Sequence, residues 1–288
     1  MLLSREEMSF DFGGARLSPQ RDRDLLRFVF SQYLYGEVTG IQVGHWFYAA
    51  PDLDAARFLA KQAVEEMQHV GNFLRILGSL GLEPEPPHPL LRFLATGMMG
   101  DDWAQHVATE MALGEGFVLT TMYAVADTLD DPDTVAIINR AARQEESHVD
   151  FGERRTQALL HDRPELRQRL LGQCLIWLWG VERLGDYLIK HSDGQHPVLQ
   201  QLPEFTAHTL RCAELRMVRM GLCHVAPLSL PWVTRARLMM TASGQAAFGA
   251  LTAPLQALRR PRRLTDRYLE DPTLRSLLST AAGESPRR

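Results

Sequence analysis

Apolar residues recur at helical spacing through most of this chain. Over residues 21–50 they lie three or four positions apart, which places their side chains on one face of an α-helix. Alternation of the kind that marks β-strands is scarce. The pattern therefore predicts an all-α fold. The predicted helices cover residues 21–50, 52–80, 101–129, 133–160, 165–190, 200–224 and 230–258.

Two kinds of break separate these helices. Pro51 ends the first helix, and Asp52 is a plausible N-cap for the second. Residues 81–100 contain four prolines and three glycines and predict a long connection rather than a helix. Twenty extended residues span about 65 Å, more than the length of about 42 Å of a 28-residue helix. This link could therefore return the chain along a full helical bundle.

These breaks predict four segments. Residues 1–20 are polar and form an N-terminal arm, and residues 21–160 form a four-helix bundle with one long crossover. Residues 161–258 form a C-terminal helical extension packed on the bundle, and residues 259–288 form a basic, polar tail.

Composition narrows the class of protein. Of the 288 residues, 45% are hydrophobic and 23% are charged, as in ordinary globular proteins. A net charge of −4 gives no general attraction for nucleic acid, so DNA is not an expected partner. Three cysteines are too few for a disulfide framework, and neither a signal peptide nor a membrane span is recognised. We therefore expect a cytoplasmic location.

Two Glu-x-x-His steps lie inside predicted helices, Glu66–His69 and Glu145–His148. Residues three apart on a helix lie on one face, so each pair could bind the same cation. A third copy, Glu85–His88, lies in the proline-rich link and cannot be helical, so we interpret it as a chance occurrence.

In the first hairpin, one further glutamate lies at the depth of the first step. Glu37 precedes Pro51 by 14 residues, and Glu66 follows it by 15. If both helices reach the turn, the two carboxylates differ in depth by roughly 1.5 Å.

In the second hairpin, two glutamates compete for the same role. Glu115 precedes Pro132 by 17 residues and Glu145 follows it by 13, a difference of roughly 6 Å in depth. For Glu110 the difference is roughly 13 Å, so Glu115 is the predicted ligand.

The predicted ligands are hard and rich in oxygen. Four carboxylates and two imidazoles suit two divalent iron or manganese ions, including a mixed pair, better than zinc. The carboxylates would also neutralise the charge of two such ions. The alternative is that these residues form buried Glu–His pairs or face solvent. The set comprises Glu37, Glu66, His69, Glu115, Glu145 and His148.

This order of ligands resembles the ferritin-like di-iron carboxylate superfamily over residues 30–155. The segment EESHVDFGE, residues 145–153, further resembles oxygenase members such as aldehyde-deformylating oxygenases and the phenylacetyl-CoA epoxidase catalytic subunit. The resemblance implies an enzyme with two iron ions (Fe2+/Fe3+), catalytic carboxylates at Glu37, Glu66, Glu115 and Glu145, and a peroxo-diferric intermediate formed from O2. It also implies an external electron donor, a ferredoxin or a reductase, and a small acyl, amine or aromatic substrate, free or linked to a carrier or CoA.

Within that superfamily, an oxygenase is favoured over an iron handler. The chain continues about 125 residues past the bundle, which could cover a substrate pocket, and lacks the Cys-x-x-Cys pairs of rubrerythrins. Glycines flank Glu37 and Glu115, which suggests either space beside the metals or close helix contacts. The alternative function is a ferroxidase or a rubrerythrin-like, peroxide-detoxifying protein. The glycines are Gly36, Gly40, Gly44, Gly114 and Gly116.

Several neighbours of the predicted ligands are candidates for the second shell or for a pocket. Two tyrosines could hydrogen-bond the centre or act in redox steps, and the apolar residues could line a pocket, but core packing explains all of them equally well. The candidates are Tyr33, Gly40, Met111, Val118 and Tyr123. The arginine-rich end of the last helix, residues 259–263, could meet a membrane surface, an acyl-carrier or CoA phosphate or RNA, or simply be solvated. A homodimer remains an open expectation.

Overall fold

A computed structural model describes residues 2–41, 46–47, 50–97, 102–191 and 194–257. Within these residues the regular structure is helical, with no β-strand and one isolated β-bridge between Leu17 and Leu129. The predicted all-α class is confirmed. The chain divides into two compact units.

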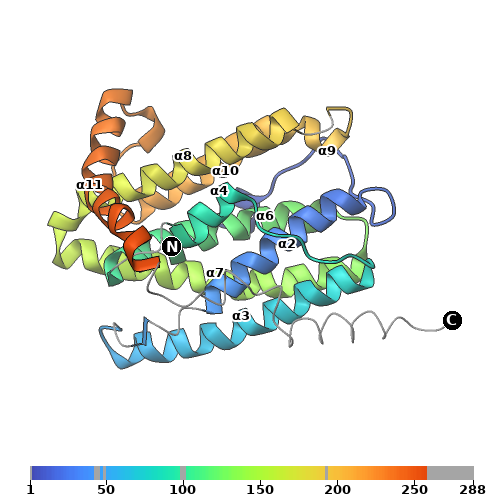
Figure 1. Cartoon of the computed structure of the whole chain (residues 1–288), viewed down its shortest axis with the longest axis horizontal. Helices are drawn as coiled ribbons and strands as arrows, with labels where there is room; N and C mark the ends of the chain where they lie inside the picture. The colour runs from blue at the N-terminus through green and yellow to red at the C-terminus, as the bar shows by residue number, and fades with distance from the viewer. Residues whose placement is uncertain (1, 42–45, 48–49, 98–101, 192–193, 258–288) are drawn as a thin grey trace. The chain divides into compact units, whose positions relative to one another are not determined.

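Among the described residues, the first unit comprises Leu17–Thr96 and Leu129–Ile137. Its described core is a pair of adjacent helices, α2 (Arg23–Gly40) and α3 (Leu53–Ser79) (Figure 1). The apolar stripes predicted from the sequence face each other across this pair. The fully buried side chains include Leu26, Phe30 and Leu34 of α2 and Leu59, Phe73 and Leu77 of α3.

At the turn of the first hairpin, the sequence predicted the start of α3 correctly but not the end of α2. Asp52 caps α3 by accepting a hydrogen bond from the Ala55 amide at 2.7 Å, as predicted. The prediction that α2 continues to residue 50 is wrong, because α2 ends at Gly40. The Thr39 hydroxyl bonds back to the carbonyls of Tyr35 and Gly36, and glycine is a poor helix former, so the last turn is weak. Residues 42–45 and 48–49 lie outside the described residues.

The proline-rich link is only partly extended. It contains α4 (Pro89–Arg92) and the π-helix η2 (Phe93–Gly97), so the prediction of a link without helix is wrong over these residues. Proline is well suited to the first turn of α4, because its missing N–H is not needed there. Before α4 the link runs in the same direction as α2 and is held by polar contacts. These are Arg27 to the Glu83 carbonyl (2.8 Å), the Glu85 amide to Ser31 (3.0 Å) and the His88 amide to Gln32 (2.8 Å).

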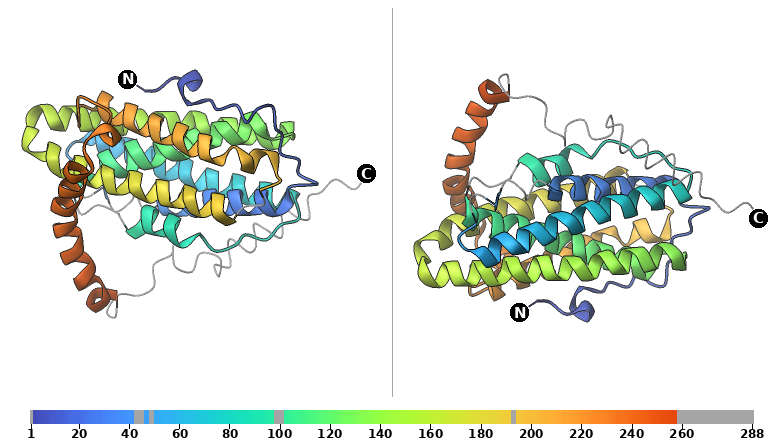
Figure 2. Two further views of the ribbon diagram at one scale, coloured as in Figure 1. Left: turned by 90° about the horizontal axis from the view of Figure 1, so that it is seen from above. Right: turned by 90° about the horizontal axis from the view of Figure 1, so that it is seen from below.

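The second unit comprises Met1–Arg16, Gly97–Thr128 and Ile138–Arg260. It holds most of the long helices, and Figure 2 gives two further views of them. Residues 132–137 at the start of α7 belong to the first unit. The elements are α1 (Arg5–Met8), α5 (Trp103–Gln105), the π-helix η3 (His106–Gly114), α6 (Glu115–Thr128), α7 (Pro132–Asp162), the 3-10 helix η4 (Pro164–Leu166), α8 (Arg167–His191), α9 (Pro197–Gln200), α10 (Leu202–Arg219), the 3-10 helix η5 (Pro227–Ser229) and α11 (Trp232–Ala257).

Helix α8 is the scaffold of this unit, because both α10 and α11 pack on it (Figures 1 and 2). Glycines permit the closest approaches. A Cβ atom at Gly172 would lie 2.4 Å from the Leu238 carbonyl oxygen of α11, and one at Gly185 would lie 2.6 Å from Thr206 of α10. Helix α10 in turn packs on α6 and η3, so it forms part of the surroundings of Glu115.

Two helices in this unit differ from the prediction. Helix α10 ends at Arg219 rather than near residue 224, because Gly221 adopts φ +78° and closes a Schellman motif. In that motif the Leu222 amide bonds to the Met217 carbonyl at 3.0 Å. The predicted helix over residues 101–129 is present, but its first half contains the nine-residue π-helix η3 that the sequence pattern did not reveal.

The N-terminal residues lie against α10. A capping box between Ser4 and Glu7 starts α1, and Leu3 and Met8 are buried. Glu7 forms an ion pair with Arg219 at 2.5 Å. The segment is therefore held by both apolar and charged contacts.

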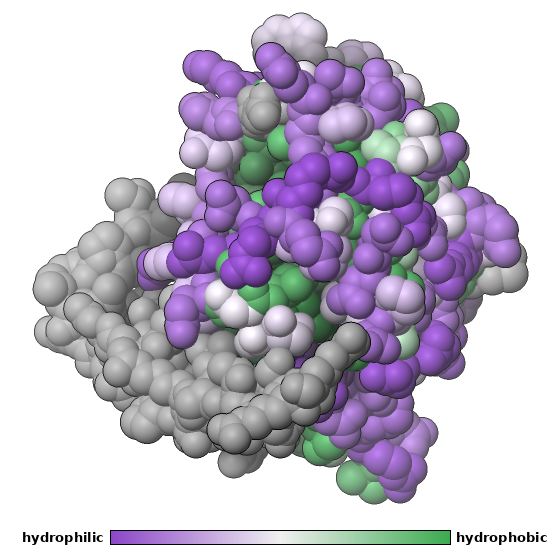
Figure 3. Space-filling view, turned by 90° about the vertical axis from the view of Figure 1, so that its right-hand side faces the viewer, coloured by the Kyte–Doolittle hydropathy of each residue, from purple (hydrophilic) through white to green (hydrophobic). Residues whose placement is uncertain are grey.

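Figure 3 shows one face of the molecule. Among the residues that are coloured there, hydrophilic side chains prevail, with apolar patches between them. All three cysteines are free and buried, and burial raises the pKa of the Cys174 thiol to about 12. No described helix is both long enough and apolar enough to span a bilayer.

The contact between α8 and α11 can be tested at Gly172. We expect Gly172→Ala to lower the free energy of unfolding by about 1–3 kcal/mol, because the added methyl group meets backbone that cannot move away. Gly71→Ala in α3 is the matched control, since nothing lies within 4 Å of its Cβ position, and helix propensity alone predicts a small gain. Calorimetric melting measures both, and an unchanged Gly172→Ala variant would contradict the contact.

Candidate metal centre

The first unit holds a buried triad of Glu37, Glu66 and His69. Helix α2 supplies Glu37 and α3 supplies the other two, which lie three residues apart on one face. One ligand atom from each residue lies within 4.8 Å of the others, and none of the three is more than 3% exposed. We call this set the first triad.

The contacts within the first triad have the spacing of metal ligands. His69 Nδ1 lies 3.0 Å from Glu37 Oε2. Two ligand atoms bound at about 2.1 Å and at right angles around one ion are separated by about 3.0 Å. The same distance also suits a hydrogen bond, so the geometry permits either. Gln62, fully buried one turn before Glu66, donates to Glu66 Oε1 at 3.2 Å and orients that carboxylate.

Gly40 makes room for Glu66. A Cβ atom at Gly40 would lie 2.5 Å from Glu66 Oε2, which is closer than real contacts allow. By contrast, nothing lies within 4 Å of a Cβ atom at Gly36, one turn earlier on the same helix. Close approach to the neighbouring helix therefore explains the glycine at position 40, whereas no atom limits a side chain at Gly36. Gly44 lies outside the described residues.

The second unit holds the second triad, Glu115, Glu145 and His148. Its ligand atoms also lie within 4.8 Å of one another. His148 Nδ1 is 3.2 Å from Glu145 Oε2 and 3.9 Å from Glu115 Oε2. Glu145 and His148 are buried, whereas the Glu115 side chain is 19% exposed. Both triads thus combine one Glu-x-x-His step with one glutamate from another helix, and both present the imidazole Nδ1 atom.

The sequence predicted the correct partners in both triads, but two assumptions about the helices that carry them were wrong. Helix α6 ends at Thr128, so 13 residues separate Glu115 from its end and 13 separate the start of α7, Pro132, from Glu145. The predicted difference of 6 Å came from counting the turn as helix. For Glu37 the assumption of a continuous helix to Pro51 is wrong, yet the contact with His69 is present.

A π-helix leads directly into Glu115. Its last turn is closed by the Glu115 amide, which bonds to the Glu110 carbonyl five residues earlier. Segments of π-helix are rare and occur often at functional sites, because the extra residue per turn redirects the side chains. Glu110 itself pairs with the buried His106, with 2.8 Å between Oε2 and Nδ1. The structure therefore groups Glu115 with the second triad and Glu110 with His106.

A buried ion pair supports the second triad from α10. Arg216 donates to Glu153 of α7 at 3.0 Å, and neither side chain is more than 1% exposed. A Cβ atom at Gly116 would lie 2.6 Å from Arg216 Nε, so this glycine makes room for the guanidinium beside Glu115. Burial lowers the pKa of Arg216, and Glu153 opposes that shift. Burial also raises the pKa of Glu153, with Arg216 acting in the opposite direction.

The remaining candidates occupy mostly packing positions. Tyr33 lies in an aromatic cluster, 5.3 Å from the Phe73 ring centroid. The Tyr123 hydroxyl donates to Glu146, the neighbour of Glu145, at 2.5 Å, and burial raises the pKa of Tyr123. Met111 is fully buried and Val118 half-buried. Whether any of them borders a substrate pocket stays a prediction.

The third Glu-x-x-His copy serves a structural role. Its His88 side chain caps α4 by accepting from the Leu90 amide at 3.2 Å. Its Glu85 carboxylate lies 3.6 Å from Arg27 Nε. This copy lies before the start of α4, as expected from its prolines. Its histidine caps that helix, and its glutamate pairs with an arginine of α2.

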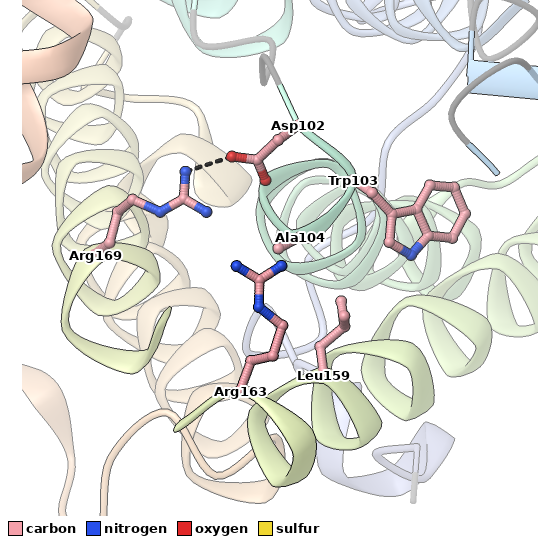
Figure 4. Close-up of a pocket in the computed structure, with 6 residues that line it drawn as sticks. All are labelled: Asp102, Trp103, Ala104, Leu159, Arg163 and Arg169. Atoms are coloured by element: carbon pink, nitrogen blue, oxygen red, sulfur yellow. Dashed lines mark hydrogen bonds and ion pairs between the residues drawn. The ribbon is translucent and has the colours of Figure 1, made fainter. Parts of the chain in front are cut away.

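A pocket in the second unit is separate from all of these candidates. It has a volume of about 240 Å3 and lies between α5, the end of α7 and the start of α8 (Figure 4). Asp102 binds Arg169 across it, and Arg163 points toward Ala104 from another side. None of the six lining residues, which also include Trp103 and Leu159, is a member of a triad.

Sequence reasoning missed three supports of the triads: Gln62, the Arg216–Glu153 pair and η3. Gln62 could have been predicted from the sequence, because it lies four residues before Glu66 on the same helical face. Arg216 and Glu153 are distant in sequence, and no local pattern marks a π-helix. The comparisons give no independent guide, since no family model, curated protein or solved structure matches the chain.

The buried Glu and His clusters could hold metal ions, and the glycine pair on α2 tests this for the first triad. We expect Gly40→Ala to weaken binding of a divalent ion by about 10–100-fold, because the methyl group displaces the Glu66 carboxylate. Gly36→Ala, one turn away with open space around it, should bind as the wild type does. Anaerobic titration with ferrous or manganous ion measures both. Binding by Gly40→Ala with the affinity of the wild type would show that Glu66 is not a ligand.

Proposed function

We propose that the two triads together form one dinuclear iron centre and that the chain is an O2-dependent oxygenase with a ferritin-like four-helix bundle. The observation that carries this proposal is the repetition of one buried donor set, Glu plus Glu-x-x-His, in both units. Manganese or a mixed pair is compatible with the same donors.

The charge of the donors supports a pair of divalent ions. Four carboxylates carry four negative charges, and burying an isolated carboxylate is costly unless a cation or donor compensates it. Two divalent ions supply four positive charges, and neutral imidazoles add none. When bound, ferrous ions would supply electrons to O2 and hold it next to a substrate.

The protein's own residues would fix and shield this centre. Gln62 orients Glu66, and Arg216 with Glu153 fixes α10 beside α6 and α7 near Glu115. Tyr123 holds Glu146 by a hydrogen bond, so the acid next to Glu145 is already engaged. Burial of Glu37, Glu66, His69, Glu145 and His148 keeps bulk water from the ligands.

An organic substrate is favoured over iron as the substrate. Helix α10 is integral to the second unit, because it packs on α6 and η3 and places Arg216 against Gly116, the neighbour of Glu115. An iron oxidase would need an acidic path for repeated entry of iron, whereas Glu65, the acid beside Glu66, is paired with Lys61 at 2.9 Å. The class of substrate, acyl, amine or aromatic, follows only from the resemblance of residues 145–153 to oxygenases.

The proposed reaction requires a reductant. Insertion of one oxygen atom into a substrate consumes O2, two electrons and two protons and releases the second oxygen atom as water. The sequence contains no flavin or nicotinamide fingerprint. A separate electron donor, such as a ferredoxin or a reductase, would therefore deliver the two electrons.

Metal content tests the centre. After anaerobic loading with ferrous iron we expect about two irons per chain, as in ferritin-like di-iron proteins. Glu66→Ala and His148→Ala should each lower the content sharply, because each removes a ligand from a different triad. Asp54→Ala, an exposed acid near the start of α3, is the control. Tetrahedral zinc, or no metal after reconstitution, would contradict the proposal.

Oxygen consumption separates an oxygenase from an iron handler. The reduced protein with a chemical electron donor is supplied with acyl, amine and aromatic compounds in turn, and O2 uptake and products are followed. An oxygenase should form product from one class of compound, with one O2 consumed per product. Repeated oxidation of many ferrous ions per chain, indifferent to every compound, would favour the iron handler.

A further inference from the structure

The first part of helix α11 presents an apolar, cationic ridge that neither triad uses. Val233, Arg237 and Met240 lie on one face, at spacings of four and three residues. Val233 is 58% exposed and Met240 is 68% exposed. Trp232, at the first position of the helix, is 72% exposed. Large apolar side chains exposed together on one short stretch of helix indicate a surface that binds a partner molecule or a membrane.

The opposite face of α11 is already occupied. Leu238 and Ala242 approach α8 at Gly172, where a Cβ atom would lie 2.4 Å from the Leu238 carbonyl oxygen and 2.8 Å from the Ala242 side chain. Ala242 is only 2% exposed. The helix is therefore anchored on one side, and the ridge is its free side.

The sequence around the ridge contains basic residues and no acidic ones. From residue 215 to residue 265 the sequence has eight arginines and no aspartate or glutamate. Two of these arginines are paired, Arg216 with Glu153 and Arg219 with Glu7, and four lie outside the described residues. The remaining two, Arg235 and Arg237, give the first part of α11 a net positive charge. Near the start of α8, Asp102 before α5 pairs with Arg169, and Glu165 of η4 pairs with Arg163. Glu214, which precedes the acid-free stretch, accepts from the Leu228 amide at 2.7 Å. A ridge with this charge has the sign that complements an anionic surface.

We propose that this ridge, Trp232, Val233, Arg237 and Met240, docks the protein on the surface of an anionic lipid membrane. Tryptophan at the start of a helix suits the boundary between head groups and acyl chains. Valine and methionine would enter the acyl boundary, and arginine can keep its guanidinium at the phosphates while its stem follows the apolar side chains. A single projecting helix fits a deformable lipid surface, whereas a protein partner would need a matching groove. The proposal does not depend on the metal centre.

Flotation of the full chain with lipid vesicles tests the proposal. We expect binding to phosphatidylcholine vesicles that contain about 30% phosphatidylglycerol at about 0.1 M salt, and little binding to phosphatidylcholine alone. The double variant Val233→Ser/Met240→Ser should reduce the bound fraction about tenfold or more. Leu53→Ser, at an apolar side chain of α3 that is 82% exposed, should bind as the wild type does. Melting curves confirm that the variants fold.

Tryptophan fluorescence identifies the docking residue. A blue shift on vesicle binding should be lost in Trp232→Phe while flotation is retained, because the other four tryptophans stay in place. Equal binding to both vesicle types, or binding that the double variant leaves unchanged, would overturn the proposal. So would a dimer in light scattering that the double variant dissociates without any vesicle binding, since the ridge would then join two copies of the chain.

Discussion

The burial of carboxylates is the constraint on which the proposed centre depends. Glu37, Glu66 and Glu145 are almost completely removed from water, and in each triad an imidazole lies against them. A buried carboxylate without compensation costs several kcal/mol, so such groups are found with metals, cations or several hydrogen-bond donors. Two divalent ions would compensate all four ligand carboxylates at once. In that view, metal binding and the stability of the helices that carry the ligands are linked.

The same constraint explains features that look unfavourable in isolation. A helical glycine costs about 1 kcal/mol relative to alanine, yet Gly40 and Gly116 are positions where a methyl group would strike Glu66 and Arg216. A buried arginine is also costly, and Arg216 is tolerated because Glu153 faces it. These residues exchange local helix stability for the placement of charged groups. The π-helix before Glu115 is a further departure from regular α-helix next to a proposed ligand.

The sequence predicted the elements that depend on local chemistry. Helical spacing gave the all-α class, the Asp52 cap and both Glu-x-x-His faces, because each follows from residues a few positions apart. It could not give the end of α2 at Gly40, which depends on how the Thr39 hydroxyl bonds back to its own helix. It also could not give η3 or the Arg216–Glu153 pair, because tertiary packing decides both. Whether the six ligands share one centre was a prediction from the sequence and remains the central proposal.

X-ray absorption at the iron edge tests that proposal most directly. The protein is loaded anaerobically with ferrous iron, and the environment of the metal is measured in the wild type and in His69→Ala. A dinuclear centre predicts a first shell of oxygen and nitrogen, with imidazole scattering, and a second iron at roughly 3.5–4 Å. Loss of His69 should weaken the imidazole scattering and the iron–iron scattering together. Two irons with no metal neighbour would show that each triad binds alone, and a tetrahedral shell would contradict the account altogether.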